Sequence, residues 1–117
     1  MTEPTILIVD DDEDLTDLYS VYLDSEHNTK IAHSGKEALE KLDSSVDMML
    51  LDRRMPGYSG DEVLADVGKK GWEGSVIFTS AIYKEDTGPE VAADDYLEKP
   101  IDRDDLIKTV EENLQPY

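Results

Sequence analysis

The hydrophobic pattern alternates between two periods along the whole chain. Short unbroken apolar runs are typical of strands buried on both faces of a parallel sheet, and each run is followed by apolar residues spaced three and four apart, as on one face of a helix. The runs predict strands at residues 6–9, 30–32, 46–51, 75–79 and 96–97, the second of them weak. The helical faces are Leu15, Leu18, Tyr19, Tyr22 and Leu23; Ala38, Leu39 and Leu42; Val63, Leu64 and Val67; and Leu106, Ile107, Val110 and Leu114.

Capping and breaking residues mark where several helices begin and end. Residues 34–37 and 59–62 each match a capping box, in which a serine and a glutamate side chain satisfy free N–H groups at a helix start. Gly68 and Gly71 are expected to end the third helix. Residues 84–93 are poorly periodic and contain a Gly-Pro pair, which predicts a shortened fourth helix.

The order of these elements predicts the fold class. Five strand-then-helix units in succession imply a parallel sheet with helices on both faces, because right-handed crossovers place them there. A length of 117 residues is typical of one domain. We therefore expect a single α/β domain over residues 1–117: a doubly wound, five-stranded parallel sheet of the flavodoxin-like (βα)5 type.

Charge adds to this picture more than any other property of the composition. The chain has 29 acidic and 11 basic residues and a formal net charge of −18, with the acids spread along its whole length. Repulsion argues against direct binding to nucleic acid or to a membrane surface, and such an acidic surface is suited to high salt, as in a halophile. Without cysteine or a long apolar run, the chain is expected to be cytoplasmic.

Chemically active side chains follow the predicted strands at their carboxyl ends, where ligands bind in sheets of this kind. They are Asp10, Asp11 and Asp12 after the first strand, Asp52 after the third, Thr79 and Ser80 at the end of the fourth, and Lys99 after the fifth. Neighbouring carboxylates repel one another unless they are protonated or bridged by a cation, and hard oxygen ligands with room for water and phosphate suit Mg²⁺. The sequence therefore predicts a metal-bound acidic pocket.

Four segments together resemble the receiver domain of two-component response regulators, the CheY-like superfamily, over nearly the whole chain. They are ILIVDDDEDL at 6–15, MMLLDRRMPGYSGDEVL at 48–64, VIFTSA at 76–81 and DDYLEKP at 94–100. Any one would be weak evidence, but in this order they are specific. The resemblance implies a phosphoacceptor in a phosphorelay rather than a turnover enzyme. It also implies a sensor histidine kinase as partner, and a link to transcription regulation through an output domain or a downstream protein.

The resemblance implies that Asp52 takes a phosphoryl group from a phosphohistidine of the kinase. It further implies that Asp11, Asp52 and the backbone carbonyl of Arg54 bind Mg²⁺ directly, while Asp10 acts through water. This agrees with the chemistry, because phosphoryl transfer to a carboxylate depends mostly on positioning and on cations that neutralise the phosphoryl oxygens.

Three further residues receive roles from the same resemblance. Ser80 would hydrogen-bond the phosphoryl group, Lys99 would pair with it, and Tyr96 would change its packing when Ser80 moves. On the residues alone, Thr79 competes with Ser80, and only the alignment to the family's pattern favours Ser80. The bond between Lys99 and Pro100 is expected to be cis.

Other functional classes fit the sequence less well. Asp10 and Asp12 after an apolar strand also suggest a haloacid-dehalogenase-like phosphatase, but Lys99 is followed by a helix rather than by further metal-binding acids. A calcium-binding loop fails because Leu15 and Val21 stand where Gly and Glu are needed. A receiver-like interaction module that is never phosphorylated would be expected to have lost the acceptor aspartate or the lysine, and neither is lost.

Several polar residues have simpler explanations. Asp12 is expected to cap the first helix, and the Arg53-Arg54 pair to provide local charge balance. His27 and His33 are expected to be solvated side chains away from the active edge. The end of the chain, residues 115–117, fits either a stand-alone regulator or the start of a linker to an output domain.

Overall fold

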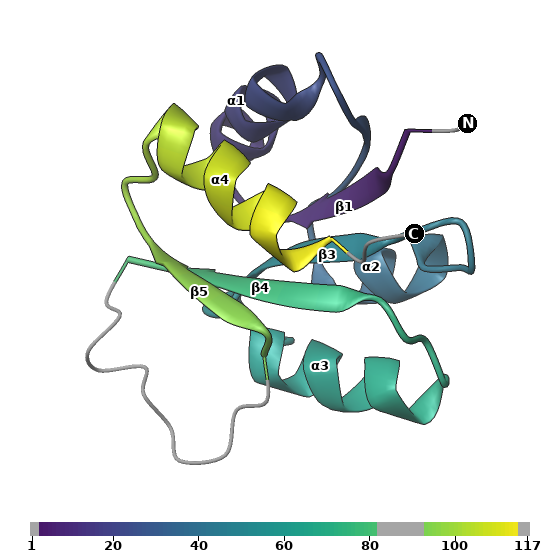
Figure 1. Ribbon diagram of the computed structural model, residues 1–117. Helices are drawn as coiled ribbons and strands as arrows, with labels where there is room; N and C mark the ends of the chain where they lie inside the picture. Colours follow the sequence, from purple (N-terminus) through teal and green to yellow (C-terminus); the bar gives the residue numbers. More distant parts are fainter. Residues whose placement is uncertain (1–2, 82–92, 115–117) are drawn as a thin grey trace.

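One parallel sheet forms the centre of the computed structural model, which describes residues 3–81 and 93–114 (Figure 1). Its strands are β1 (Thr5–Val9), β2 (Asn28–Ala32), β3 (Met48–Asp52), β4 (Ser75–Ser80) and β5 (Asp95–Glu98), in the spatial order β2-β1-β3-β4-β5. The helices of the described residues are α1 (Glu13–Leu23), α2 (Gly35–Lys41), α3 (Gly60–Lys69) and α4 (Arg103–Asn113). The predicted doubly wound α/β fold is confirmed. The segment expected to hold a shortened helix, residues 84–93, lies outside the described residues except for its last residue.

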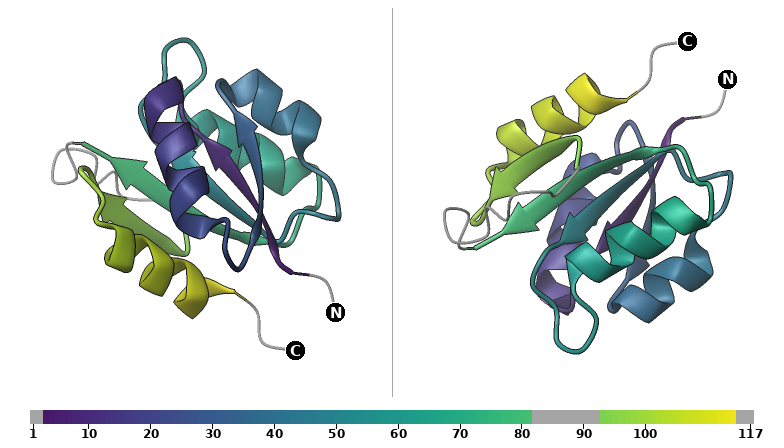
Figure 2. Two further views of the ribbon diagram at one scale, coloured as in Figure 1. Left: turned by 90° about the horizontal axis from the view of Figure 1, so that it is seen from above. Right: turned by 90° about the horizontal axis from the view of Figure 1, so that it is seen from below.

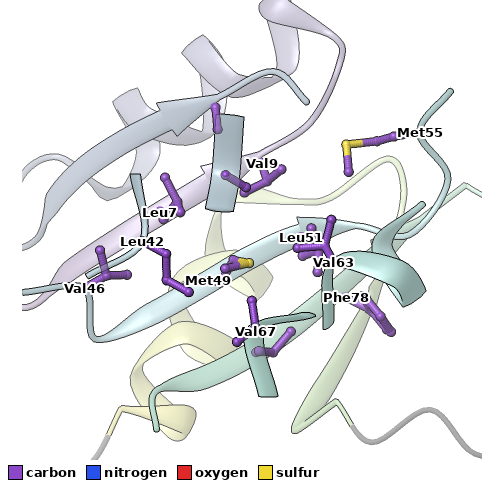
Figure 3. Packing of buried hydrophobic residues seen from close by; sticks show 13 residues of the cluster. Leu7, Val9, Leu42, Val46, Met49, Leu51, Met55, Val63, Val67 and Phe78 are labelled. Atoms are coloured by element: carbon purple, nitrogen blue, oxygen red, sulfur yellow. The ribbon is translucent and has the colours of Figure 1, made fainter. Parts of the chain in front are cut away.

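The helices form two layers, one on each face of the sheet. Figure 2 shows α1 and α4 on one face and α2 and α3 on the other. Side chains alternate along each strand, so each strand contributes to both cores: Ile6 and Ile8 pack in the α1–α4 layer, whereas Leu7 and Val9 pack in the α2–α3 layer (Figure 3). All five residues of β3 are buried, as is expected for a central strand covered on both faces.

The helix starts follow the capping residues closely. The Asp12 side chain accepts hydrogen bonds from the backbone N–H groups of Asp14 and Leu15, which confirms it as the cap of α1. At α3 the box of Ser59 and Glu62 is complete. At α2 the serine bond forms, but the glutamate accepts from the N–H of the residue before the cap instead. That bond satisfies a donor at the end of β2.

Some expectations at the surface were wrong. Leu18 is 41% exposed although it was assigned to an apolar face, because the buried side of α1 is formed by Thr16, Tyr19 and Leu23, with Leu15 and Tyr22 partly buried beside them. Gly68 lies within α3, and the chain turns at Gly71, whose φ of 75° favours glycine.

Each histidine departs from the prediction of a solvated side chain away from the active edge, but in a different respect: His27 precedes β2, away from that edge, yet is buried, whereas His33 lies at the edge. His27 is 5% exposed, and its Nδ1 contacts the Leu23 carbonyl oxygen at 3.2 Å. His33 directly follows β2 at the carboxyl edge of the sheet, where its Nε2 lies 3.1 Å from the Thr16 hydroxyl. Within the described residues, no helix is long and apolar enough to span a bilayer.

Candidate functional site

Three carboxylates gather at the carboxyl edge of the two central strands. Asp10 and Asp11 follow β1, and Asp52 ends β3. One oxygen from each lies within 4.8 Å of the others, with Asp10 and Asp52 buried and Asp11 exposed. Adjacent parallel strands bring these residues together although they are about forty positions apart in the sequence. Such a group of hard oxygen ligands, open to solvent on one side, fits a divalent cation such as Mg²⁺.

Backbone hydrogen bonds orient the two buried carboxylates. The N–H of Asp12 donates to Oδ1 of Asp10 at 3.0 Å, and the N–H of Arg54 donates to Oδ1 of Asp52 at 3.1 Å. In both residues the other oxygen, Oδ2, faces Lys99. The carboxylates are therefore held in place by the chain segments that immediately follow them.

Lys99 supplies the cation that these carboxylates need. Its Nζ donates to Asp10 Oδ2 at 2.8 Å and lies 3.4 Å from Asp52 Oδ2. Burial lowers the pKa of Lys99, but the hydrogen bond to Asp10 and the two carboxylate charges outweigh burial, so its pKa lies above the usual value. The backbone N–H of Lys99 donates to the Ser80 carbonyl oxygen at 2.8 Å, which ties the residue to β4. The ammonium thus stays charged and in place beside Asp52.

The ionised form of Asp52 remains unfavourable even with Lys99 beside it. Burial and the neighbouring Asp10 charge raise the pKa of Asp52 to about 7, against the opposing effects of Lys99 and of the Arg54 N–H. A carboxylate that resists ionisation in this way gains from any further positive charge beside it. The site therefore favours the binding of a cation in addition to the Lys99 ammonium.

Gly60 lets α3 begin directly against the backbone that follows Asp52. Its N–H donates to the Arg53 carbonyl oxygen at 2.9 Å. A Cβ at this position would lie 2.6 Å from the Asp52 carbonyl oxygen and 2.7 Å from Cα of Arg53, both backbone atoms that cannot move aside cheaply. The glycine therefore fixes the loop after β3 close to the acidic cluster.

A second group of residues lies on the opposite face, in the α2–α3 layer. Arg53 is largely buried, donates to Asp61 on α3 at 2.9 and 3.3 Å, and has its guanidinium 5.5 Å from the ring centre of Phe78. The Phe78 ring centre lies 6.0 Å from that of Tyr96. Arg53 therefore provides charge balance as expected, but it also packs on an aromatic pair, which sequence reasoning missed.

Some of the predicted site residues converge at the carboxyl edge, whereas Ser80, Thr79 and Arg54 are placed less directly. Asp10, Asp11, Asp52 and Lys99 come together, and the Lys99-Pro100 bond is cis as expected. Ser80 and Thr79 are both buried at the end of β4. Alternation puts Ser80 on the face of Phe78, the layer of Tyr96, and Thr79 on the face of Ile77. Arg54 is exposed.

Tyr19 is a further residue at the site that sequence reasoning placed only in the core. It is 2% exposed on α1, and burial raises its pKa to about 12, so the phenol keeps its proton at neutral pH. Among the charges that act on its pKa, that of Lys99 lowers it, and those of Asp10 and Asp52 raise it. The only feature of the sequence that could have pointed to Tyr19 as a site residue is its hydroxyl, because an apolar side chain would suffice at a core position.

Comparison with known proteins gives a consistent result. A family model described as "Response regulator receiver domain" matches residues 6–111. A candidate transcriptional regulator of Haloferax volcanii is 42% identical over 96% of this chain and 19% of its own length. The transcriptional regulatory protein CpxR of Klebsiella pneumoniae is 39% identical over 90% of this chain and 47% of its own. The chain thus spans about half or less of the length of these relatives.

Solved structures agree with this result. The chemotaxis response regulator CheY4 of Vibrio cholerae superimposes with a TM-score of 0.86 at 26% identity, covering 97% of this chain and 100% of that one. A CheY-like receiver domain protein of Methanospirillum hungatei gives a TM-score of 0.84 at 27% identity, with 95% and 93% covered. The Haloferax relative is also consistent with the expected salt-adapted surface.

Proposed function

The chain belongs to the family of response regulator receiver domains, and on that premise we propose that Asp52 is the residue that accepts the phosphoryl group. The observation that carries this assignment is the position of its Oδ2, which faces Lys99 at the open edge of the sheet while Oδ1 is held by a backbone N–H. One oxygen is thereby oriented by the chain, and the other is available to a phosphorus atom.

The transfer that fits this geometry is a direct displacement. An oxygen of Asp52 attacks the phosphorus of a phosphohistidine, the bond between phosphorus and the imidazole nitrogen breaks, and that nitrogen keeps the electron pair. Lys99 neutralises phosphoryl oxygens on its side of the site. Asp11, Asp52 and the Arg54 carbonyl would hold Mg²⁺, with Asp10 acting through water, and the ion would supply charge neutralisation when bound. By the family resemblance, Ser80 would donate its hydroxyl to the phosphoryl group from the end of β4, although alternation puts Thr79 rather than Ser80 on the face of Asp52. Tyr96, in the same layer as Ser80, would respond to that contact.

The expected partners follow from this role. We propose a sensor histidine kinase as donor, and an output domain or a downstream protein as the recipient of the signal. The names of the relatives support a role in transcription regulation. The net charge of −18 argues that this segment does not itself bind DNA. Receiver domains are signalling domains rather than turnover enzymes, and we propose that this one promotes only its own phosphorylation and dephosphorylation.

The direct test is phosphorylation with a small phosphodonor such as acetyl phosphate. In the presence of Mg²⁺, intact-mass spectrometry should show the addition of one phosphoryl group, and peptide mapping should place it on Asp52. With the donor but with a chelator in place of Mg²⁺, the modification should be slow or absent. A group attached at another residue would refute the assignment.

Magnesium binding should depend on Asp11 and not on its neighbour Asp12. Asp11 belongs to the carboxylate cluster, whereas Asp12 caps α1. Asp11→Ala should weaken Mg²⁺ binding by about 100-fold. Asp12→Ala should cost about 1 kcal/mol of stability and leave the affinity within about twofold. Calorimetric titration with Mg²⁺ distinguishes the two, and equal losses would show that the ligand has been assigned one position out of register.

The affinity for Mg²⁺ should also fall as the pH is lowered through neutrality. The metal binds the ionised carboxylate, and the pKa of Asp52 in the metal-free protein is raised to about 7. Below that pH each bound ion must displace a proton, so the apparent Kd should rise by up to about tenfold per pH unit. Titrations at constant ionic strength between about pH 8 and pH 6 measure this. A constant Kd would contradict the raised pKa.

A further inference from the structure

The Tyr19 hydroxyl is the one buried side-chain polar atom in residues 3–81 and 93–114 that has no hydrogen-bond partner. Its ring packs in the α1–α4 layer with Ile8 and Leu50. These residues lie two positions before Asp10 and Asp52, and so share a face of the sheet with the two buried carboxylates. The ring therefore lies beneath the candidate phosphorylation site rather than in a remote part of the core.

The segment that follows β5 also packs beside Tyr19. Ile101, two positions after Lys99, packs in the same cluster as Tyr19. The electrostatic interaction between Tyr19 and Lys99 is mutual, since each acts on the other. The Tyr19 ring and the pair formed by Lys99 and Asp10 therefore lie on the same face of the sheet, and no hydrogen bond joins the phenol to the ammonium.

An unpartnered buried hydroxyl lowers stability, and phenylalanine would fill the same space without that cost. Local violations of this kind are characteristic of functional positions. In the resting structure Lys99 lies closer to Asp10, at 2.8 Å, than to Asp52, at 3.4 Å. If the ammonium pairs with a phosphoryl group on Asp52 and leaves Asp10, one of its three N–H donors needs a new acceptor.

Resting on the proposed phosphorylation of Asp52, we propose that Tyr19 is a positioning residue for Lys99, whose ammonium donates a hydrogen bond to the Tyr19 hydroxyl once it has left Asp10 for the phosphoryl group. Tyr19 touches neither the donor nor the phosphoryl group. It gives the lysine a second buried partner, so that the ammonium can turn toward Asp52 without leaving a donor unsatisfied. Among the described residues, no other buried side-chain oxygen lacks a hydrogen-bond partner.

The test compares Tyr19→Phe with wild type and with Tyr22→Phe, a control on the same helix whose ring packs against the same cluster from a less buried position. Initial rates of phosphorylation by acetyl phosphate are measured at saturating Mg²⁺. Hydrogen exchange of the Lys99 ammonium is followed by NMR in the fluoroberyllate-bound proteins. Tyr19→Phe should phosphorylate about tenfold more slowly, and its Lys99 ammonium should exchange about tenfold faster. Its Mg²⁺ affinity and melting temperature should not fall, and Tyr22→Phe should match wild type throughout.

Equal phosphorylation rates in Tyr19→Phe and wild type would overturn the inference. A slower rate with unchanged exchange at Lys99 would also overturn it, because the effect would then come from packing of the ring. A wild-type protein that forms no phosphoprotein would refute the proposed function itself, and the inference with it.

Discussion

Replacing Asp52 with asparagine is expected to abolish phosphorylation while leaving the fold intact. The amide has nearly the same volume but no nucleophilic carboxylate, and Lys99 keeps its hydrogen bond to Asp10. Incubation with acetyl phosphate and Mg²⁺, followed by intact-mass spectrometry, should show no phosphoprotein. Asp12→Asn is the matched control: it makes the same chemical change next to the site, and asparagine caps a helix as well as aspartate does. Undiminished incorporation in the Asp52 variant would contradict the assignment.

The same substitution should change how stability depends on pH. In the metal-free protein the pKa of Asp52 is raised from 3.8 to about 7, so the folded state holds a proton that the unfolded chain has already released. Wild type should therefore lose stability as the pH rises from about 4 to about 7, by a few kcal/mol at most. Asp52→Asn should lack this component. Thermal melts in a chelator across this range measure the difference, and parallel pH profiles would contradict it.

Salt should markedly increase the stability of the folded protein. With 11 basic residues against 29 acidic ones, most acids have no basic partner of their own. The Debye length falls from about 10 Å at 0.1 M salt to about 3 Å at 1 M, which screens the repulsion. We expect molar salt to stabilise the protein by about 2 kcal/mol, equivalent to a rise in Tm of about 10 °C. Thermal melts across this range test the prediction, and a Tm that does not move would contradict it.

The two glutamates at the end of α4 provide a variant that separates screening from other effects of salt. Glu111 and Glu112 lie in the last turn, where the helix dipole disfavours negative charge, and that turn contains no basic residue. Exchanging both for glutamine should raise the Tm at low salt and reduce its dependence on salt. If the Tm rises equally with salt concentration in the variant and in wild type, salt acts instead through a general effect on apolar burial.

The fold and the acidic cluster could be predicted because both follow from simple periodic rules. Parallel strands end at a common edge, so Asp10, Asp52 and Lys99 had to converge once the strands were correctly placed. Solvent exposure was harder to predict. Leu18 was misjudged because the way α1 lies on the sheet, which no local pattern encodes, decides which side of the helix is buried. His27 was misjudged because its burial depends on the turn after α1, where its ring contacts the Leu23 carbonyl oxygen.

Roles that depend on contacts across the fold were also missed. Arg53 was read only as charge balance, since its packing on Phe78 depends on the register between β3 and β4. Tyr19 was assigned to the core, which is correct for its ring. The unpartnered state of its hydroxyl becomes visible only when all its neighbours are placed. Single sequences reveal which groups share an edge more readily than which groups lack a partner.

The alternation of side chains at the end of β3 also affects how domains of this kind can diverge. Asp52 belongs to one layer, and the next residue, Arg53, packs on the other, among residues of α3 and β4. Side chains on the outer surface of α2 and α3 therefore belong to the layer opposite the carboxylate cluster. A duplicated gene can retain the ancestral phosphoacceptor while its α2–α3 surface changes through neutral drift and selection, so that descendants share one chemistry and differ in the surface they present.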